Sequence, residues 1–153
     1  MNTRSILAGL LLAVAVSLAS CGGASSNPQS DNSLPSQSVG DPKLVAELCK
    51  LANTENRLCP QKSDNGVVME SVTYNSNTFQ YKYLLEGENI YAEDNDINLK
   101  NLAKSSYKGR PEARPFINAL INTNSRLVFH YRTKGGKTIY LEFTPSELKT
   151  FVY

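Results

Sequence analysis

The sequence has few of the residue types on which metal binding and nucleophilic catalysis depend. It contains one histidine, three cysteines and no tryptophan in 153 residues. A zinc site uses three or four Cys, His or carboxylate ligands, and a Ser-His-Asp arrangement needs a histidine held as a base. His130 alternates with Phe129 and Tyr131 along a predicted strand, which turns it away from the core, and nothing in the sequence selects a catalytic partner for it. We therefore predict no catalytic residue, no metal and no cofactor.

The sequence also lacks an apolar run long enough to span a bilayer. The longest run extends over residues 6–18, whereas a spanning helix needs about 20 apolar residues. Arg4 precedes this run, and the small residues Ala19 and Ser20 follow it. A positive charge, a short apolar core and small residues form the pattern of a signal peptide. We predict that the protein is exported and that residues 1–20 form no part of the fold.

A lipid anchor is predicted from a resemblance at the end of this run. Leu18-Ala19-Ser20-Cys21 resembles the lipobox of bacterial lipoproteins at all four positions. The resemblance implies cleavage before Cys21, a diacylglycerol on its sulfur and a further acyl chain on the new amino terminus, and two or three chains anchor a protein stably. Gly22, where Asp would imply retention in the inner membrane, favours an outer-membrane protein facing the periplasm. The alternative is an ordinary secretory signal with an incidental cysteine.

The rest of the chain divides into a linker and one domain. Residues 21–40 are rich in Ser, Asn, Gln, Gly and Pro and have hardly any aliphatic side chains, so we predict that they are disordered. Residues 41–153 are long enough for one modest core. Without Arg4 the sixteen basic residues become fifteen, against fourteen acidic ones. This balance gives no overall field that would favour nucleic acid as a partner.

The apolar pattern of residues 41–153 predicts an α+β domain. Asp41 and Pro42 begin a first helix, two hairpins turn at residues 75–77 and at Gly135-Gly136, and helices are predicted over residues 96–104 and 115–121. A last helix begins at Thr144. The expected order is α-ββ-α(α)-ββ-α, with an antiparallel sheet of about four strands and the helices packed on one face. The strand residues predicted to face the core are Phe79, Tyr81, Tyr83, Leu85, Leu127, Phe129, Tyr131, Ile139, Leu141 and Phe143.

Cys49 and Cys59 are ten residues apart in a chain that carries an export signal. In an oxidising compartment, such a pair favours a disulfide over a metal site or a nucleophile. We expect this disulfide to join the first helix to the chain that enters the first strand. Two free thiols are the alternative.

Candidate binding residues are predicted on the polar side of the sheet, at a hairpin tip and in a basic segment. Tyrosine on a polar sheet face suits a protein interface, and a basic segment suits phosphate-bearing lipids or an acidic partner. The alternative for the basic segment is a solvated connection between the hairpins. The candidates are Tyr140 and His130 on the sheet, Lys134 and Lys137 at the tip, and Arg110 and Arg114 in the segment.

Three segments resemble small exported bacterial proteins in which two hairpins are separated by helices: Cys59-Pro60, YKYLL from Tyr81, and RLVFHYRTKGGKTIYLEF from Arg126. The outline is also similar to small outer-membrane assembly lipoproteins and to the β-lactamase-inhibitor-like fold. These are binding modules, so the resemblance implies binding and no catalytic residues.

The leading functional prediction is a membrane-anchored envelope lipoprotein that serves as a non-enzymatic adaptor or accessory subunit for another envelope protein. A tethered inhibitor of a hydrolase, which would use the hairpin tip, is the first alternative. The second is a small hydrolase that would use carboxylates chosen from Glu86, Glu88, Glu93 and Asp94.

Overall fold

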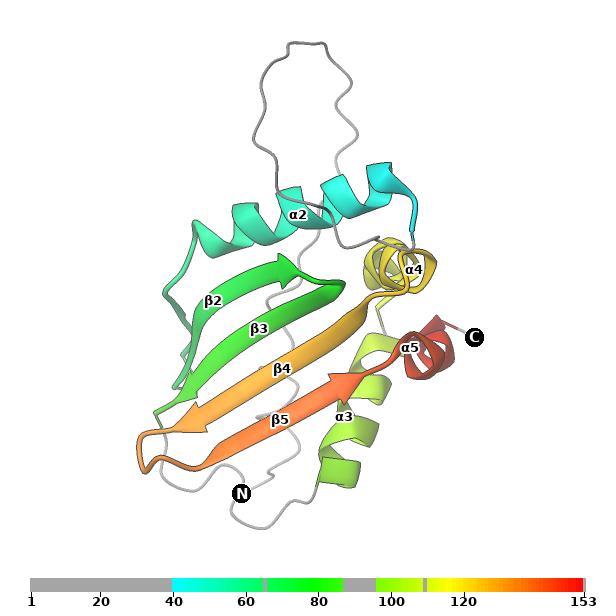
Figure 1. The fold of residues 1–153 in the computed structure, drawn as a ribbon. Helices are drawn as coiled ribbons and strands as arrows, with labels where there is room; N and C mark the ends of the chain where they lie inside the picture. The colour runs from blue at the N-terminus through cyan, green and yellow to red at the C-terminus, as the bar shows by residue number, and fades with distance from the viewer. Residues whose placement is uncertain (1–39, 65, 87–95, 109, 153) are drawn as a thin grey trace.

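The computed structural model describes residues 40–64, 66–86, 96–108 and 110–152, which form one sheet with helices on one side (Figure 1). The signal segment, the lipobox with Cys21 and the linker to residue 39 lie outside the described residues. The strands, in spatial order, are β1 (Gln61–Lys62), β2 (Val67–Asn75), β3 (Thr78–Leu85), β4 (Arg126–Thr133) and β5 (Thr138–Phe143). The helices are α2 (Pro42–Asn56), α3 (Asp96–Lys108), the 3-10 turn η1 (Pro111–Ala113), α4 (Arg114–Asn122) and α5 (Pro145–Val152). The predicted α+β class is confirmed.

Both predicted hairpins are present, and their turns have the backbone conformation that short hairpins require. Ser76 and Asn77, between β2 and β3, have φ of 44° and 56°, which matches the left-handed pair of a type I′ turn. Gly136, between β4 and β5, has φ of 86°, which glycine adopts without strain. All ten strand residues predicted to face the core are buried.

The prediction of an antiparallel sheet of about four strands is wrong in one pairing. β3 and β4 run parallel, with Thr78 opposite Arg126 and Leu85 opposite Thr133. The connection between them contains α3, η1 and α4. A crossover of this kind brings the chain back to the end of the sheet at which β3 begins, so that β4 starts beside the start of β3. The two hairpins therefore join side by side into one mixed sheet. The fifth strand, β1, has only two residues and was not predicted.

The core lies between one face of this sheet and the helices. Tyr81 of β3 stacks on Phe129 of β4 with ring centroids 5.5 Å apart, and Phe79 meets Phe116 of α4 edge-on at 4.9 Å. The end of α2 is tied to the sheet, because the Val72 amide of β2 donates to Asn56 Oδ1 at 3.0 Å. The helical residues buried in the core are Leu48, Ala52, Leu99, Ala103, Tyr107, Phe116, Ile117, Leu120, Leu148 and Phe151.

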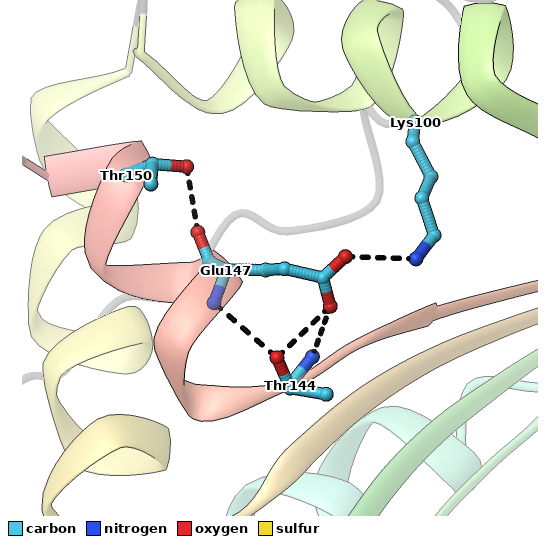
Figure 2. A network of polar contacts seen from close by, with 4 residues as sticks. All are labelled: Lys100, Thr144, Glu147 and Thr150. Atoms are coloured by element: carbon cyan, nitrogen blue, oxygen red, sulfur yellow. Dashed lines mark hydrogen bonds and ion pairs between the residues drawn. The ribbon is translucent and has the colours of Figure 1, made fainter.

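The last helix begins at the predicted position with a capping box, shown in Figure 2. The Glu147 amide donates to Thr144 Oγ1 at 3.3 Å, and the Thr144 amide donates to Glu147 Oε2 at 2.8 Å. Lys100 of α3 reaches Glu147 Oε1 at 2.9 Å, so the cap also joins α3 to α5. Partial burial opposes ionisation of Glu147, but the hydrogen bonds from Thr144 and the contact with Lys100 hold the pKa of its carboxyl below the usual value.

Candidate docking surfaces

The outer face of the sheet, which no described helix covers, carries two of the predicted binding residues (Figure 1). His130 of β4 and Tyr140 of β5 are register partners on this face, with ring centroids 6.2 Å apart. Tyr140 is 52% exposed. The alternation along β4 and β5 therefore placed both residues correctly.

The charges on this outer face are largely paired with one another. Glu70 accepts two hydrogen bonds from the Arg132 guanidinium, at 3.0 and 2.5 Å, and this contact lowers the pKa of the Glu70 carboxyl. Arg126 pairs with Glu142 at 3.2 Å. A partner that covered this face would have to desolvate charged groups that already have partners, which costs affinity. The outer face is therefore better suited to contact with solvent than to docking.

The hairpin tip lies at one end of the sheet, with its two glycines exposed. Lys134 contacts Glu86 at 3.5 Å, and Lys62 pairs with the same carboxylate. The Lys137 amide donates to Thr133 Oγ1 at 3.1 Å, which closes the turn. The contact with Lys62 is the largest influence on the Glu86 carboxyl and lowers its pKa. A general acid needs a raised pKa, so this contact does not favour Glu86 for that role.

The other three carboxylates considered for hydrolysis, Glu88, Glu93 and Asp94, lie outside the described residues. Arg110 and Arg114, the basic candidates, lie at the start of η1 and of α4. These elements belong to the helical side of the sheet, and His130 and Tyr140 lie on the other side. The structure therefore does not gather the six predicted binding residues into one site.

An apolar groove lies between α2 and α4. Its volume is about 200 Å³. Leu48 and Phe116, both 2% exposed, form its floor, and Ala119 leaves it open because its side chain is short. The remaining lining residues are Leu44, Glu47, Leu51, Pro115, Asn118 and Asn122.

The signal for this groove in the sequence is an apolar helical stripe, which by itself also fits a core face. Leu44, Leu48 and Leu51 follow one another at helical spacing, which predicts that all three face the core. In the structure Leu48 is buried, but Leu44 and Leu51 are only half-buried. The apolar face of α2 is thus wider than the surface it covers on the sheet, and the excess forms one wall of the groove.

A buried carboxyl group lies one turn beyond Leu51 on the same side of α2, toward the C-terminal end of the helix. Glu55 is 8% exposed, and its Oε2 atom and the hydroxyls of Tyr81 and Tyr107 have no hydrogen-bond partner among the described residues. Burial raises the pKa of Glu55 to about 7. The nearby Tyr81 hydroxyl lowers the pKa of Glu55 and so opposes part of this effect. The two groups are not, however, placed to form a hydrogen bond. Glu55 is therefore neutral over much of the acidic range.

The predicted disulfide is not formed in the structure, in which Cys49 and Cys59 are both free. Cys49 lies within α2, and Cys59 follows the helix, where its thiol donates to the Glu55 carbonyl at 3.6 Å. Glu55 is six residues beyond Cys49, or about 9 Å along a helix that rises 1.5 Å per residue. A disulfide needs Cα atoms within about 7 Å, so the helix itself holds the two cysteines apart.

Neither metal ligands nor a membrane-spanning helix is found in the described part of the chain. Among these residues, no three His, Cys, Asp or Glu side chains gather where they could hold a metal ion. None of the described helices has both the length and the apolarity needed to cross a bilayer.

Three solved structures share this fold. A Pseudomonas aeruginosa protein described as secreted has a TM-score of 0.54 and 14% identity, over 69% of this chain and 93% of that one. The type II secretion system pilotin AspS of Vibrio cholerae has a TM-score of 0.51 and 13% identity, and the pilotin EpsS of Vibrio vulnificus has 0.52 and 11%. Each pilotin match covers 69% of this chain and 92% of the pilotin. No protein-family model and no curated protein matches the chain. At these identities the likeness establishes the fold alone.

Proposed function

We propose that the protein is a lipid-anchored, non-enzymatic adaptor of the cell envelope that binds a segment of another envelope protein in the groove between α2 and α4. The observation that favours this function is the groove itself, a concave apolar surface that the fold leaves open between two helices. Apolar grooves between helices are suited to holding amphipathic segments of partner proteins.

Two further observations support the proposal. The lipobox pattern at Leu18-Ala19-Ser20-Cys21 supplies the anchor, and two of the structures with this fold are pilotins of a secretion system, while the third is described as secreted. A tether of this kind raises the local concentration of the adaptor around a partner in the same membrane.

The groove is tested by filling it in the full-length chain. Ala119→Gln places a larger, polar side chain inside the groove, and Ala46→Gln makes the same change at an exposed position on α2 that does not line it. Each variant is cross-linked in intact cells and purified through a C-terminal tag. We expect one stoichiometric envelope protein with wild type and with Ala46→Gln, and at least a tenfold loss with Ala119→Gln. Equal recovery with both variants would contradict the groove as the binding site.

The anchor is tested separately with Cys21→Ala. Cells fed tritiated palmitate should label the wild-type protein and leave the variant unlabelled. A labelled variant, or an unlabelled wild type, would refute the lipobox interpretation whatever the groove experiment shows.

A further inference from the structure

The solvent face of α2 carries a strip of three cations. Lys43, Lys50 and Arg57 are each seven residues apart and all exposed. Seven residues are close to two helical turns, so the three side chains fall within about 40° of one another around the helix axis. Leu48 and Ala52, each 2% exposed, mark the opposite side of α2, which faces the core. The strip therefore points directly away from the protein.

These cations have no ion-pair partner among the described residues, whereas Arg126, Arg132, Lys100 and Lys134 do. The two exposed carboxylates on or beside α2 lie at the margins of the strip. Asp41 accepts the N-cap hydrogen bond from the Lys43 amide at 2.9 Å, and Glu47 lines the groove. The strip is therefore a positive surface about 21 Å long, at 1.5 Å rise per residue, with Asp41 and Glu47 at its margins and no close ion pair to either.

An exposed apolar residue extends the strip at its far end. Leu58 directly follows Arg57 and is 63% exposed, which makes it the most exposed large apolar side chain of the described residues. A cluster of cations suits the anionic surface of a membrane, and the exposed leucine beside it adds an apolar side chain that can reach the same surface.

The position of α2 directly after the linker indicates which surface lies close to the strip. A Cβ at Gly40 would lie 2.7 Å from Thr123 Cα, so the residue that joins the linker to α2 is fixed against the turn after α4. The composition of residues 21–39, which precede it, predicts a disordered chain, and one of that length spans about 25 Å. On the proposed lipid anchor, α2 is therefore the first described element beyond the anchor, and the strip lies within reach of the membrane surface.

We propose that Lys43, Lys50 and Arg57 bind the anionic phospholipid headgroups of the membrane in which the chain is anchored, with Leu58 at the apolar boundary. This inference rests on the lipid anchor of the proposed function. It orients the domain, because α2 then lies along the bilayer, the groove opens sideways to membrane-bound partners, and the sheet faces away. Each cation near an anionic surface strengthens binding about fivefold, and salt weakens it.

The test uses the acylated full-length protein in vesicles and the reactivity of its own lysines. The protein is reconstituted in phosphatidylcholine vesicles and in vesicles of a two-to-one mixture of phosphatidylcholine and phosphatidylglycerol, then briefly acetylated and analysed by mass spectrometry. We expect Lys43 and Lys50 to react about fivefold more slowly on the anionic vesicles. Lys82 on the sheet and Lys149 on α5, both exposed, should react equally on both. The difference should vanish in about 1 M salt, where screening acts over about 3 Å.

A pair of double variants provides the matched comparison. Lys50→Gln with Arg57→Gln should return Lys43 to its reactivity on phosphatidylcholine, whereas Lys82→Gln with Lys149→Gln removes the same charge and should leave Lys43 protected. Equal reactivity of Lys43 on the two vesicle types in wild type overturns the inference. Protection in intact cells but not on anionic vesicles also overturns it and indicates an acidic protein partner. Failure of the protein to float with either vesicle type instead refutes the anchor, and so separates the two proposals.

Discussion

The buried carboxyl of Glu55 predicts that the stability of the domain falls as pH rises through the neutral range. The group lies in the α2 helix against the sheet, and burial and the Tyr81 hydroxyl are the influences on its pKa. Tyr81 and Tyr83 face it from β3, Tyr107 faces it from α3, and Cys59 lies one turn beyond it in the chain. Burial among these neutral groups raises the pKa of Glu55 to about 7. The perturbation that isolates this effect is Glu55→Gln, which mimics the neutral carboxyl in shape.

The sign and size of the effect follow from proton linkage. In the unfolded chain Glu55 ionises near its ordinary pKa of 4.5, and in the folded chain near 7. Between these values the folded state binds more protons than the unfolded state, so the free energy of unfolding falls as pH rises. The stabilisation is complete below about pH 4.5, declines by up to 1.4 kcal/mol per pH unit, and is lost above about pH 7. The full change is about 3–3.5 kcal/mol.

The assay is urea unfolding of the full-length chain, followed by circular dichroism at pH 5, 6, 7 and 8. Glu55→Gln should match wild type within about 1 kcal/mol at pH 5 and exceed it by about 3–3.5 kcal/mol at pH 8, which moves the urea midpoint by about 1–3 M. Glu47→Gln is the control, because it removes an exposed carboxylate from the same helix and should leave the pH dependence of wild type in place. If wild type and Glu55→Gln keep a constant difference from pH 5 to 8, Glu55 does not titrate near neutrality and the reasoning fails.

Three further predictions test other parts of the structure. Thr144→Ala removes the hydroxyl that accepts the Glu147 amide and should lower the free energy of unfolding by about 1 kcal/mol, measured by urea unfolding against Thr150→Ala, a threonine in the last turn of the same helix. Arg132→Gln breaks the exposed pair with Glu70 and should cost less than about 1 kcal/mol in the same assay; a loss above 3 kcal/mol would mean that the outer face is structurally essential. Thiol titration of protein purified from the envelope and unfolded in denaturant should find both Cys49 and Cys59 free, and a cross-linked peptide containing both would contradict the structure.

Local patterns in the sequence were sufficient for the hairpins, the helix starts and the faces of the strands. Alternation along β3, β4 and β5 identified all ten inward residues, because successive side chains of a strand point to opposite faces and one face of this sheet lies on the core. Asp41 and Thr144 were recognisable as caps because their hydrogen bonds are made within three residues. The position of Tyr140 on the outer face followed from the same alternation.

Features that depend on contacts between distant segments were not predictable from those patterns. The parallel pairing of β3 with β4 depends on the path of the chain through α3 and α4, and alternation is the same for either strand direction. The ion pair of Glu70 with Arg132 joins residues sixty-two positions apart, and no local pattern in the sequence brings these two side chains together. The disulfide prediction failed for a geometric reason. Ten residues in a loop can bring two cysteines together, whereas the helical residues after Cys49 carry the chain away from it.

The three features of α2 occupy different parts of one helix, the groove and Glu55 at different positions along its inner side and the cation strip on its solvent side, and this predicts that they vary independently. Glu55 faces the sheet, Leu44 and Leu51 line the groove, and Lys50 belongs to the strip that points to solvent. Perturbations at sites without shared contacts add in free energy, whereas coupled sites do not. Ala119→Gln should therefore abolish partner capture without changing the protection of Lys43 on anionic vesicles, and Glu55→Gln should alter the pH dependence of stability without changing either. If filling the groove also released the lysines from the vesicle surface, the bilayer would contact the groove itself, and a partner would have to compete with lipid for the same site.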